Sequence, residues 1–336
     1  MSLVNRYVGA PIKRVEDLRF LRGRGEFVAD LASAETLHAA ILRSPVAHAH
    51  IRAIDLKPAL AIAGVHAVIT ATEIGIVPKI PLRLQPSSAT EPFCQPVIAR
   101  DRVRYVGEPI AVVLADSAAL AENGVEAIVL DLEEVPVVAD WSISHRGETL
   151  LFQDAGTNRA MQFTAIRGDA DAAFRDAEYT RRACFSVQRH TALPLEPRGL
   201  LAEWDAAAGR LTVKGAAKVP FFNRRTVAHM MGLSETAVDL IENDVGGGFG
   251  ARGEFYPEDF LIPFAARYVG RPVVWIENRR EHLIAINHAR HTERQTGSEN
   301  PRDRTHRAHR THRRRRSRLG RRQAPKGPSF GRRCGG

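Results

Sequence analysis

Residues 237–270 read AVDLIENDVGGGFGARGEFYPEDFLIPFAARYVG and combine a short apolar segment, a glycine cluster and a longer apolar segment. The first segment (237–243) predicts a strand. The last (257–270) predicts a helix with Pro257 in its first turn, where a backbone N–H would have no helical partner. Between them, five glycines fall within residues 246–253. The stretch therefore predicts a strand, a glycine loop and a helix in succession, which indicates mixed α and β structure.

Three glycines of the loop, Gly248, Gly250 and Gly253, spell the G-x-G-x-x-G pattern of dinucleotide-binding sites. That fingerprint requires a helix that opens within the motif, whereas the helix here is expected only from Pro257. The phosphate-loop pattern is also broken, because residues 252–254 (Arg-Gly-Glu) stand where Lys and then Ser or Thr are required. A Rossmann-type NAD(P)-dependent oxidoreductase is therefore an alternative that the spacing disfavours.

A purely structural role for the loop is the second alternative. A tight turn with positive φ accounts for one or two glycines. Four of the five residues 246–250 are glycine, which favours close approach of a bulky group to the backbone. Because successive N–H groups in such a loop can form an anion-binding concavity, we expect a ligand there.

The rest of the chain alternates strand and helix patterns. We expect strands over 37–44, 65–70 and 109–115, and a helix that follows the cap Asp116-Ser117 and ends near residue 126. Residues 199–215 predict a hairpin that turns around 206–209. Residues 220–232 (PFFNRRTVAHMMG) predict a helix that ends at Gly232, and PVVWIEN (272–278) predicts a strand.

The positive charge of the protein lies in one segment. The chain of 336 residues has a net charge of +10, but residues 301–336 alone carry +13, so the first 300 residues sum to −3. This Arg-rich segment has almost no aliphatic residues and is expected to be disordered. One interpretation is a nucleic-acid-binding arm. The other, which we favour because no aromatic residues are interleaved for base stacking, is an out-of-frame translation.

The composition also narrows the class of protein. No apolar run reaches the roughly 18 residues of a membrane span, and the N-terminus lacks the apolar core of a signal peptide, so a cytoplasmic protein is expected. Cys94, Cys184 and Cys334 lie far apart, which does not support a cysteine-held iron–sulfur or zinc site. His288 and His291 have no third ligand type nearby, so we expect no metal site.

The loop DVGGGFGARGEFYPED (244–259) resembles the molybdopterin-contacting Gly-Gly-Phe-Gly loop of the xanthine dehydrogenase/aldehyde oxidase family, which includes the large subunits of aerobic carbon monoxide dehydrogenase. Further stretches are similar to family segments in the same order, and the resemblance covers roughly residues 5 to 295. These stretches are GRGEFVADLASAETLHAAILRSPVAHAHIRAID (23–55), VRYVGEPIAVVLAD (103–116), QRHTALPLEPRGLLAEWD (188–205) and WIENRREHLIAINHARH (275–291).

The resemblance implies an α+β fold. An α/β-hammerhead domain is expected at 1–145, a linker at 146–165, the N-terminal part of a molybdopterin-binding domain at 166–299, and the disordered tail at 300–336. Family chains are more than twice as long, so the resemblance implies a C-terminally truncated or frameshifted chain that is inactive alone.

The same resemblance implies an activity and partners. Family members are molybdenum hydroxylases that oxidise aldehydes or N-heteroaromatic compounds with water as the oxygen source. The implied cofactor is molybdenum-molybdopterin, expected in its cytosine dinucleotide form. Iron–sulfur and FAD-binding subunits are the expected partners, because they carry electrons away from the molybdenum site in the family.

The resemblance also assigns cofactor-binding residues. Phe249 and Gly250 match a pair whose amides face the pterin and the apical molybdenum ligand, while Gly247 and Gly248 would let the backbone approach. Lys218 stands where many members carry a glutamine that bonds the molybdenum oxo group; it could donate in the same way or be a surface lysine. Arg252, within the loop, completes the expected set.

Three features limit the assignment. Gly253 occupies the position of a substrate-contacting glutamate found in some members, with Glu254 one place later. The family's general-base glutamate lies near the C-terminus of much longer chains, so no catalytic residue is assigned here. His190 and Glu196, in RHTALPLEPRG (189–199), are similar to residues near the family's pocket, but taken alone Glu196 predicts a solvated or salt-bridged residue.

Overall fold

The fold is built around a seven-stranded sheet with the order β10-β9-β8-β11-β1-β5-β3. The computed structural model describes residues 8–83, 87–162, 164–177, 179–180, 183–187, 189–215, 217–288, 291–296 and 314–316. The strands of this sheet are β1 (Leu37–Arg43), β3 (Val65–Ile69), β5 (Pro109–Ala115), β8 (Gly199–Asp205), β9 (Arg210–Gly215), β10 (Val238–Ile241) and β11 (Val273–Ile276).

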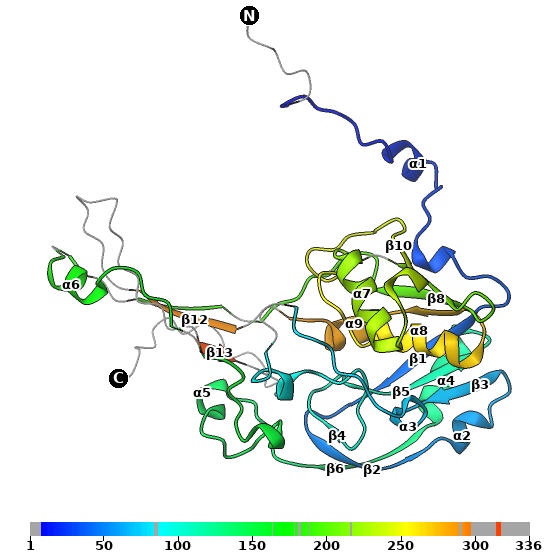
Figure 1. Cartoon of the computed structure of the whole chain (residues 1–336), viewed down its shortest axis with the longest axis horizontal. Helices are drawn as coiled ribbons and strands as arrows, with labels where there is room; N and C mark the ends of the chain where they lie inside the picture. The colour runs from blue at the N-terminus through cyan, green and yellow to red at the C-terminus, as the bar shows by residue number, and fades with distance from the viewer. Residues whose placement is uncertain are drawn as a thin grey trace, which may run out of the picture.

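Two smaller sheets have three strands each. One has the order β4-β2-β6 and consists of β4 (Arg102–Val103), β2 (Ala49–Asp55) and β6 (Val129–Glu134). The other has the order β13-β12-β7 and consists of β13 (Arg314–Arg316), β12 (His291–Thr296) and β7 (Ala183–Val187). Figure 1 shows this second sheet beside the main body, well away from α7 and α8.

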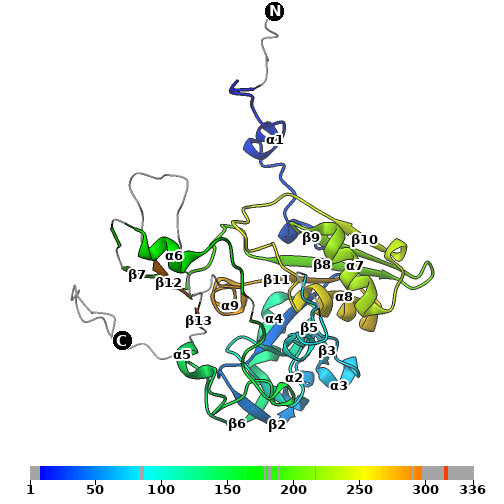
Figure 2. The same cartoon turned by 60° about the vertical axis from the view of Figure 1, so that its left-hand side comes forward.

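The described residues also form short α-helices, most of which lie against the sheets, whereas α1 lies on the N-terminal arm away from them (Figure 1). These helices are α1 (Asp17–Leu21), α2 (Lys57–Leu60), α3 (Ala71–Ile74), α4 (Ala118–Ala127), α5 (Trp141–Ser144), α6 (Ala170–Arg175), α7 (Pro220–Met231), α8 (Glu258–Val269) and α9 (Arg279–Ala285). Helix α8 packs against β8 and β11, and α7 packs against α8 and β10. Helix α4 packs against β1 and β5 at the other end of the seven-stranded sheet, as the two views show (Figures 1 and 2).

The seven-stranded sheet contains strands from both regions that the sequence assigns to separate domains. Strand β11 pairs in parallel with β1, with Leu37 opposite Val273 and Ala39 opposite Trp275. The main hydrophobic core follows this junction and includes Leu37, Trp275 and Phe260, all buried. Because backbone hydrogen bonds and core packing both cross the junction, the hammerhead and glycine-loop regions are held together directly.

The expected α+β class is confirmed, and several local predictions are close to the observed bounds. The hairpin β8–β9 turns at residues 206–209, α4 begins after the cap Ser117, and α7 ends at Gly232 in the left-handed conformation. Several elements, among them β2, β4, β12 and α9, were not predicted. Among the described residues, no helix is long and apolar enough to cross a membrane.

The expected tail (300–336) lies outside the described residues except for Arg314–Arg316. Those three residues form β13 and pair with β12, and the expected disorder of the rest of the tail stays a prediction. The backbone hydrogen bonds of β12 give this short segment a partner that its composition could not indicate. The nucleic-acid interpretation depends on residues that are not described.

Candidate functional site

The glycine loop connects the end of β10 to the start of α8. Gly247 and Gly250 have φ angles of 114° and 96°, which glycine adopts readily. Phe249 has a φ of 49°, an uncommon conformation for a residue with a large side chain, and the residue is 83% exposed. Left-handed non-glycine residues of this kind are concentrated at functional sites. The loop therefore holds a specific backbone conformation although its central side chain contacts little.

The loop presents a run of backbone donors without partners. In the part of the chain that the structure describes, the N–H groups of Gly247, Gly248, Phe249 and Gly250 donate no hydrogen bond. The carbonyls of Gly248 and Gly250 accept from the N–H groups of Ala251 and Gly253, at 2.8 and 3.2 Å. Consecutive free N–H groups suit an oxygen-rich or anionic group.

One side of the loop is open and the other is packed. A Cβ atom added at Gly248 or Gly250 would meet no atom within 4 Å. A Cβ at Gly246 would lie 2.5 Å from Cβ of Glu196, and one at Gly247 would lie 3.1 Å from Cβ of Pro194. The first two glycines therefore allow close packing on residues 194–196, and the later two leave space for a bulky group. This arrangement fits a cofactor that approaches the backbone from the open side.

The packed side is held by Glu196 and Arg252. The Glu196 carboxylate accepts from the N–H of Gly246 at 2.7 Å and from Nη2 of Arg252 at 2.7 Å. Arg252 also donates to the carbonyls of Glu196, Pro197 and Gly247, at 3.1, 3.0 and 3.0 Å. Only 5% of the Arg252 side chain is exposed. The guanidinium thus lies on the packed side, and burial lowers the pKa of Arg252 while Glu196 partly opposes that shift.

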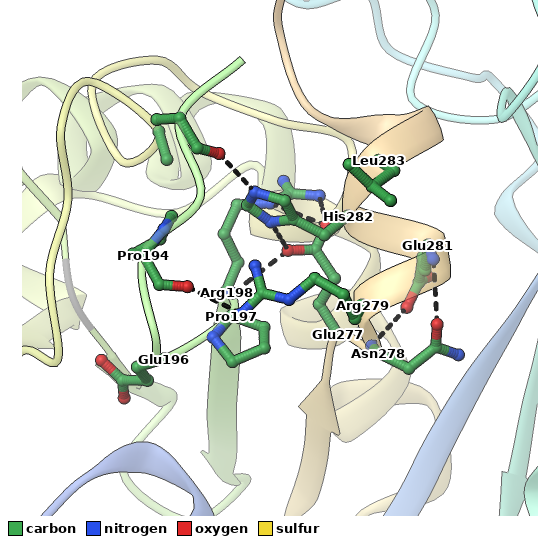
Figure 3. Close-up of polar contacts among 12 residues, drawn as sticks. Pro194, Glu196, Pro197, Arg198, Glu277, Asn278, Arg279, Glu281, His282 and Leu283 are labelled. Carbon is green, nitrogen blue, oxygen red and sulfur yellow. Dashed lines mark hydrogen bonds and ion pairs between the residues drawn. The ribbon is translucent and has the colours of Figure 1, made fainter.

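Residues 192–197, which support the loop, are fixed by side chains of α9 (Figure 3). Helix α9 begins after the cap Asn278, whose side chain accepts from the N–H of Glu281 at 2.9 Å. Arg279 donates to the carbonyls of Pro194 and Leu195, at 2.7 and 3.1 Å. Nε2 of His282 lies 2.8 Å from the carbonyl oxygen of Ala192, and its Nδ1 lies 2.7 Å from Glu277. These contacts satisfy backbone carbonyls of a segment that has no sheet partner.

A buried ion network lies beneath this segment. Arg198 donates to Glu277 at 2.6 and 3.1 Å and to Glu258 at 3.0 Å. Arg43, on β1, also bonds Glu258 and donates to Glu281 at 2.7 Å. The Arg198 guanidinium lies 4.0 Å from the ring centroid of Tyr256. The network therefore joins β1, α8 and α9 to the residue that precedes β8 and the residue that follows β11.

The Glu258 side chain is buried, although a charged residue at a helix start is normally solvated. Glu258 lies in the first turn of α8, and its side chain is buried between two arginines. Burial disfavours its ionised form, but Arg198 and Arg43 outweigh that effect and lower the pKa of Glu258 to about 2. The carboxylate is therefore ionised throughout the physiological pH range.

Two further residues considered in the sequence, Lys218 and Glu254, lie at the end of the loop. Lys218 is exposed next to the loop's end, where its backbone N–H donates to the carbonyl of Arg252 at 3.1 Å. Glu254 lies 3.6 Å from Arg83 as a half-exposed ion pair. Helix α8 begins at Glu258, after the last glycine of the loop, so no helix opens within the G-x-G-x-x-G motif. Within the described ranges, no three His, Cys, Asp or Glu side chains are grouped to hold a metal ion.

Comparison with known proteins identifies two family domains in the chain. Residues 22–136 match the aldehyde oxidase and xanthine dehydrogenase a/b hammerhead domain, and residues 151–298 match the molybdopterin cofactor-binding domain. The chain is 36% identical over 287 residues to the nicotine 6-hydroxylase large subunit of Paenarthrobacter nicotinovorans, covering 84% of this chain and 35% of that protein. It is 32% identical to the carbon monoxide dehydrogenase large chain of Hydrogenophaga pseudoflava, with 82% and 35% covered.

A solved structure agrees with these matches. Quinoline 2-oxidoreductase from Pseudomonas putida 86 superimposes with a TM-score of 0.77 at 34% identity, covering 85% of this chain and 36% of that chain. The chain thus spans about a third of the length of the relatives compared here.

Proposed function

This chain belongs to the xanthine dehydrogenase/aldehyde oxidase family of molybdopterin-dependent oxidoreductases, and from that premise we propose that its glycine loop binds the molybdenum-molybdopterin cofactor. The observation that carries the proposal is the run of four N–H groups at residues 247–250, which have no hydrogen-bond partner among the described residues and lie beside an open space. Lys218, at the end of the loop, is proposed as a further donor to the cofactor.

The activity we propose belongs to the enzyme to which this chain contributes. It is the hydroxylation of an aldehyde or an N-heteroaromatic compound with water as the oxygen source. When bound, the molybdenum cofactor supplies the two-electron oxidant for that reaction. The residues of this chain bind and orient it: preorganised N–H groups stabilise negative charge on facing oxygen atoms without reorganising. We assign no general base within the chain, and we propose that the chain alone is inactive.

Names of relatives support the proposed substrate class and partners. Nicotine 6-hydroxylase and quinoline 2-oxidoreductase carry N-heteroaromatic compounds in their names, and a further relative is a subunit of the 6-hydroxypseudooxynicotine dehydrogenase complex. We propose that iron–sulfur and FAD-binding subunits assemble with this chain and remove the electrons. We further propose the cytosine dinucleotide form of the cofactor.

Two substitutions at Phe249 test whether the backbone of the loop binds the cofactor. Phe249→Gly keeps the left-handed conformation and removes the ring, so cofactor occupancy should stay near that of the wild type. Phe249→Val places a β-branched residue at a φ of 49°, at a cost of roughly 1–3 kcal/mol, and should lower affinity about 5- to 150-fold. Occupancy is measured as molybdenum and pterin per chain after purification with partner subunits.

Phe221→Val is the matched control, because Phe221 is 72% exposed on α7 and has ordinary helical backbone. It should bind cofactor as the wild type does. An equal loss of cofactor in Phe249→Gly and Phe249→Val, which both lack the ring, would show that the ring matters rather than the amides, contrary to the proposal.

A further inference from the structure

We infer that Glu196 and Arg252 are positioning residues that hold the free N–H groups of the glycine loop in place, and that Arg252 is not itself a ligand of the cofactor. The inference rests on the proposed function, since it assigns how that site is held. It changes the role that the sequence suggests for Arg252, which resemblance alone places among the cofactor-binding residues.

The first step is the direction of the Arg252 side chain. All of its hydrogen bonds given by the structure go to Glu196, Pro197 and Gly247. These partners lie on the packed side of the loop, where a Cβ at Gly246 would collide with Glu196. The free N–H groups are next to the open side, at Gly248 and Gly250. A side chain 5% exposed on the packed side is therefore poorly placed to reach a group on the open side.

The second step is the way the pair closes the loop. Glu196 exchanges two hydrogen bonds with Gly246: its N–H donates to the Gly246 carbonyl at 3.3 Å, and its carboxylate accepts from the Gly246 N–H. Arg252 bonds the same carboxylate and, through Nε, the carbonyl of Gly247 at 3.0 Å. One ion pair thus ties residues 246 and 247 to residue 252, so the residues between them form a closed ring.

The third step is that the loop has few other restraints. Within residues 247–253, the backbone hydrogen bonds are those from Ala251 to Gly248 and from Gly253 to Gly250. From outside, Lys218, Tyr256 and Arg83 donate to the carbonyls of residues 252, 251 and 253, at 3.1, 2.8 and 3.2 Å, and none of these contacts reaches residues 247–250. Glycine has the largest conformational freedom in the unfolded chain, so a glycine-rich loop needs external restraints to keep one conformation. Because the pair is charge-assisted and largely buried, it is the strongest restraint on this ring.

The test compares Arg252→Lys, Glu196→Gln and the double variant in the full-length chain without cofactor. Lys keeps the positive charge but cannot make the forked contacts, and Gln keeps the shape of Glu without its charge. Amide hydrogen exchange, read residue by residue, should show at least a tenfold loss of protection at Ala251 and Gly253 in each single variant. The double variant should lose no more than the singles, because one interaction is removed in all three.

Arg210→Lys is the matched control, since Arg210 pairs with Asp239 on the surface at 2.5 Å and makes no contact with the loop. It should leave loop protection unchanged. Loss of protection spread equally over β5 would mean general destabilisation and would overturn the inference. So would unchanged protection at Ala251 and Gly253 in both single variants.

Cofactor occupancy, measured with the partner subunits as molybdenum and pterin per chain, separates positioning from direct binding. Positioning requires Glu196→Gln and Arg252→Lys to lower occupancy by similar factors. A loss in Arg252→Lys alone, with loop protection unchanged, would make Arg252 a ligand and overturn the inference. If wild-type chain binds no pterin, the proposed function fails, but the exchange measurements still decide whether the pair holds the loop.

Discussion

Arg198→Met is expected to lower the free energy of unfolding by about 3–5 kcal/mol, the usual effect of removing one partner from a buried ion pair. Arg198 neutralises Glu277 and Glu258, whose side chains are 0% and 2% exposed. Methionine has a similar length but leaves two carboxylates inside the protein, with Arg43 reaching only Glu258 of the two. It also removes the guanidinium that lies 4.0 Å from the Tyr256 ring.

Urea unfolding followed by circular dichroism measures the effect, with Arg210→Met as the control. Arg210 and Asp239 form a pair whose side chains are nearly half exposed, so removing it should cost at most about 1 kcal/mol. Adding Glu277→Leu to Arg198→Met should recover part of the loss, because an uncompensated charge is then removed. A stability of Arg198→Met within 1 kcal/mol of the wild type would show that the network does not stabilise the fold.

The elements of this fold were predictable from sequence where local patterns determine them. The strands and turn of the β8–β9 hairpin follow from alternation and from residues 206–209, and the end of α7 follows from Gly232. The parallel pairing of β1 with β11 was not predictable in this way. It joins residues such as Leu37 and Val273, which are far apart in the chain, and the residue pattern of neither strand indicates which strand it pairs with.

The candidate site shows the same division. The glycine cluster is visible in the sequence itself, and it indicates that a ligand approaches the backbone there. The role of Glu258 was missed, since a charged residue at a helix start is normally solvated and only the fold brings Arg43 and Arg198 to it. Likewise, Glu196 and Arg252 are separated by 56 positions in the chain, so their ion pair follows from tertiary structure.

Glu108 is expected to make the stability of the chain fall as the pH rises from about 5 to 8. Its carboxyl group is fully buried, and burial raises its pKa from 4.5 to about 7, partly opposed by Arg104. Oε2 accepts from the N–H of Arg104 at 2.5 Å, while Oε1 has no partner among the described residues. The neutral acid is therefore the form that the folded chain accommodates.

The sign of the effect follows from proton linkage. The folded-state pKa of Glu108 lies above the unfolded value, so between the two the folded chain binds more protons. The stabilisation from the neutral acid is complete below about pH 4.5 and is lost as the pH rises through about 7. The size implied by this pKa difference is about 3 kcal/mol.

Glu108→Gln removes the titration while keeping the shape of the side chain. Relative to the wild type, this variant should gain about 3 kcal/mol in free energy of unfolding between pH 5 and pH 8, measured by urea unfolding at each pH. Glu122→Gln, at an exposed position on α4, is the control, and its stability should run parallel to that of the wild type. Parallel curves for Glu108→Gln and the wild type would mean that the buried carboxyl is solvated or paired when ionised.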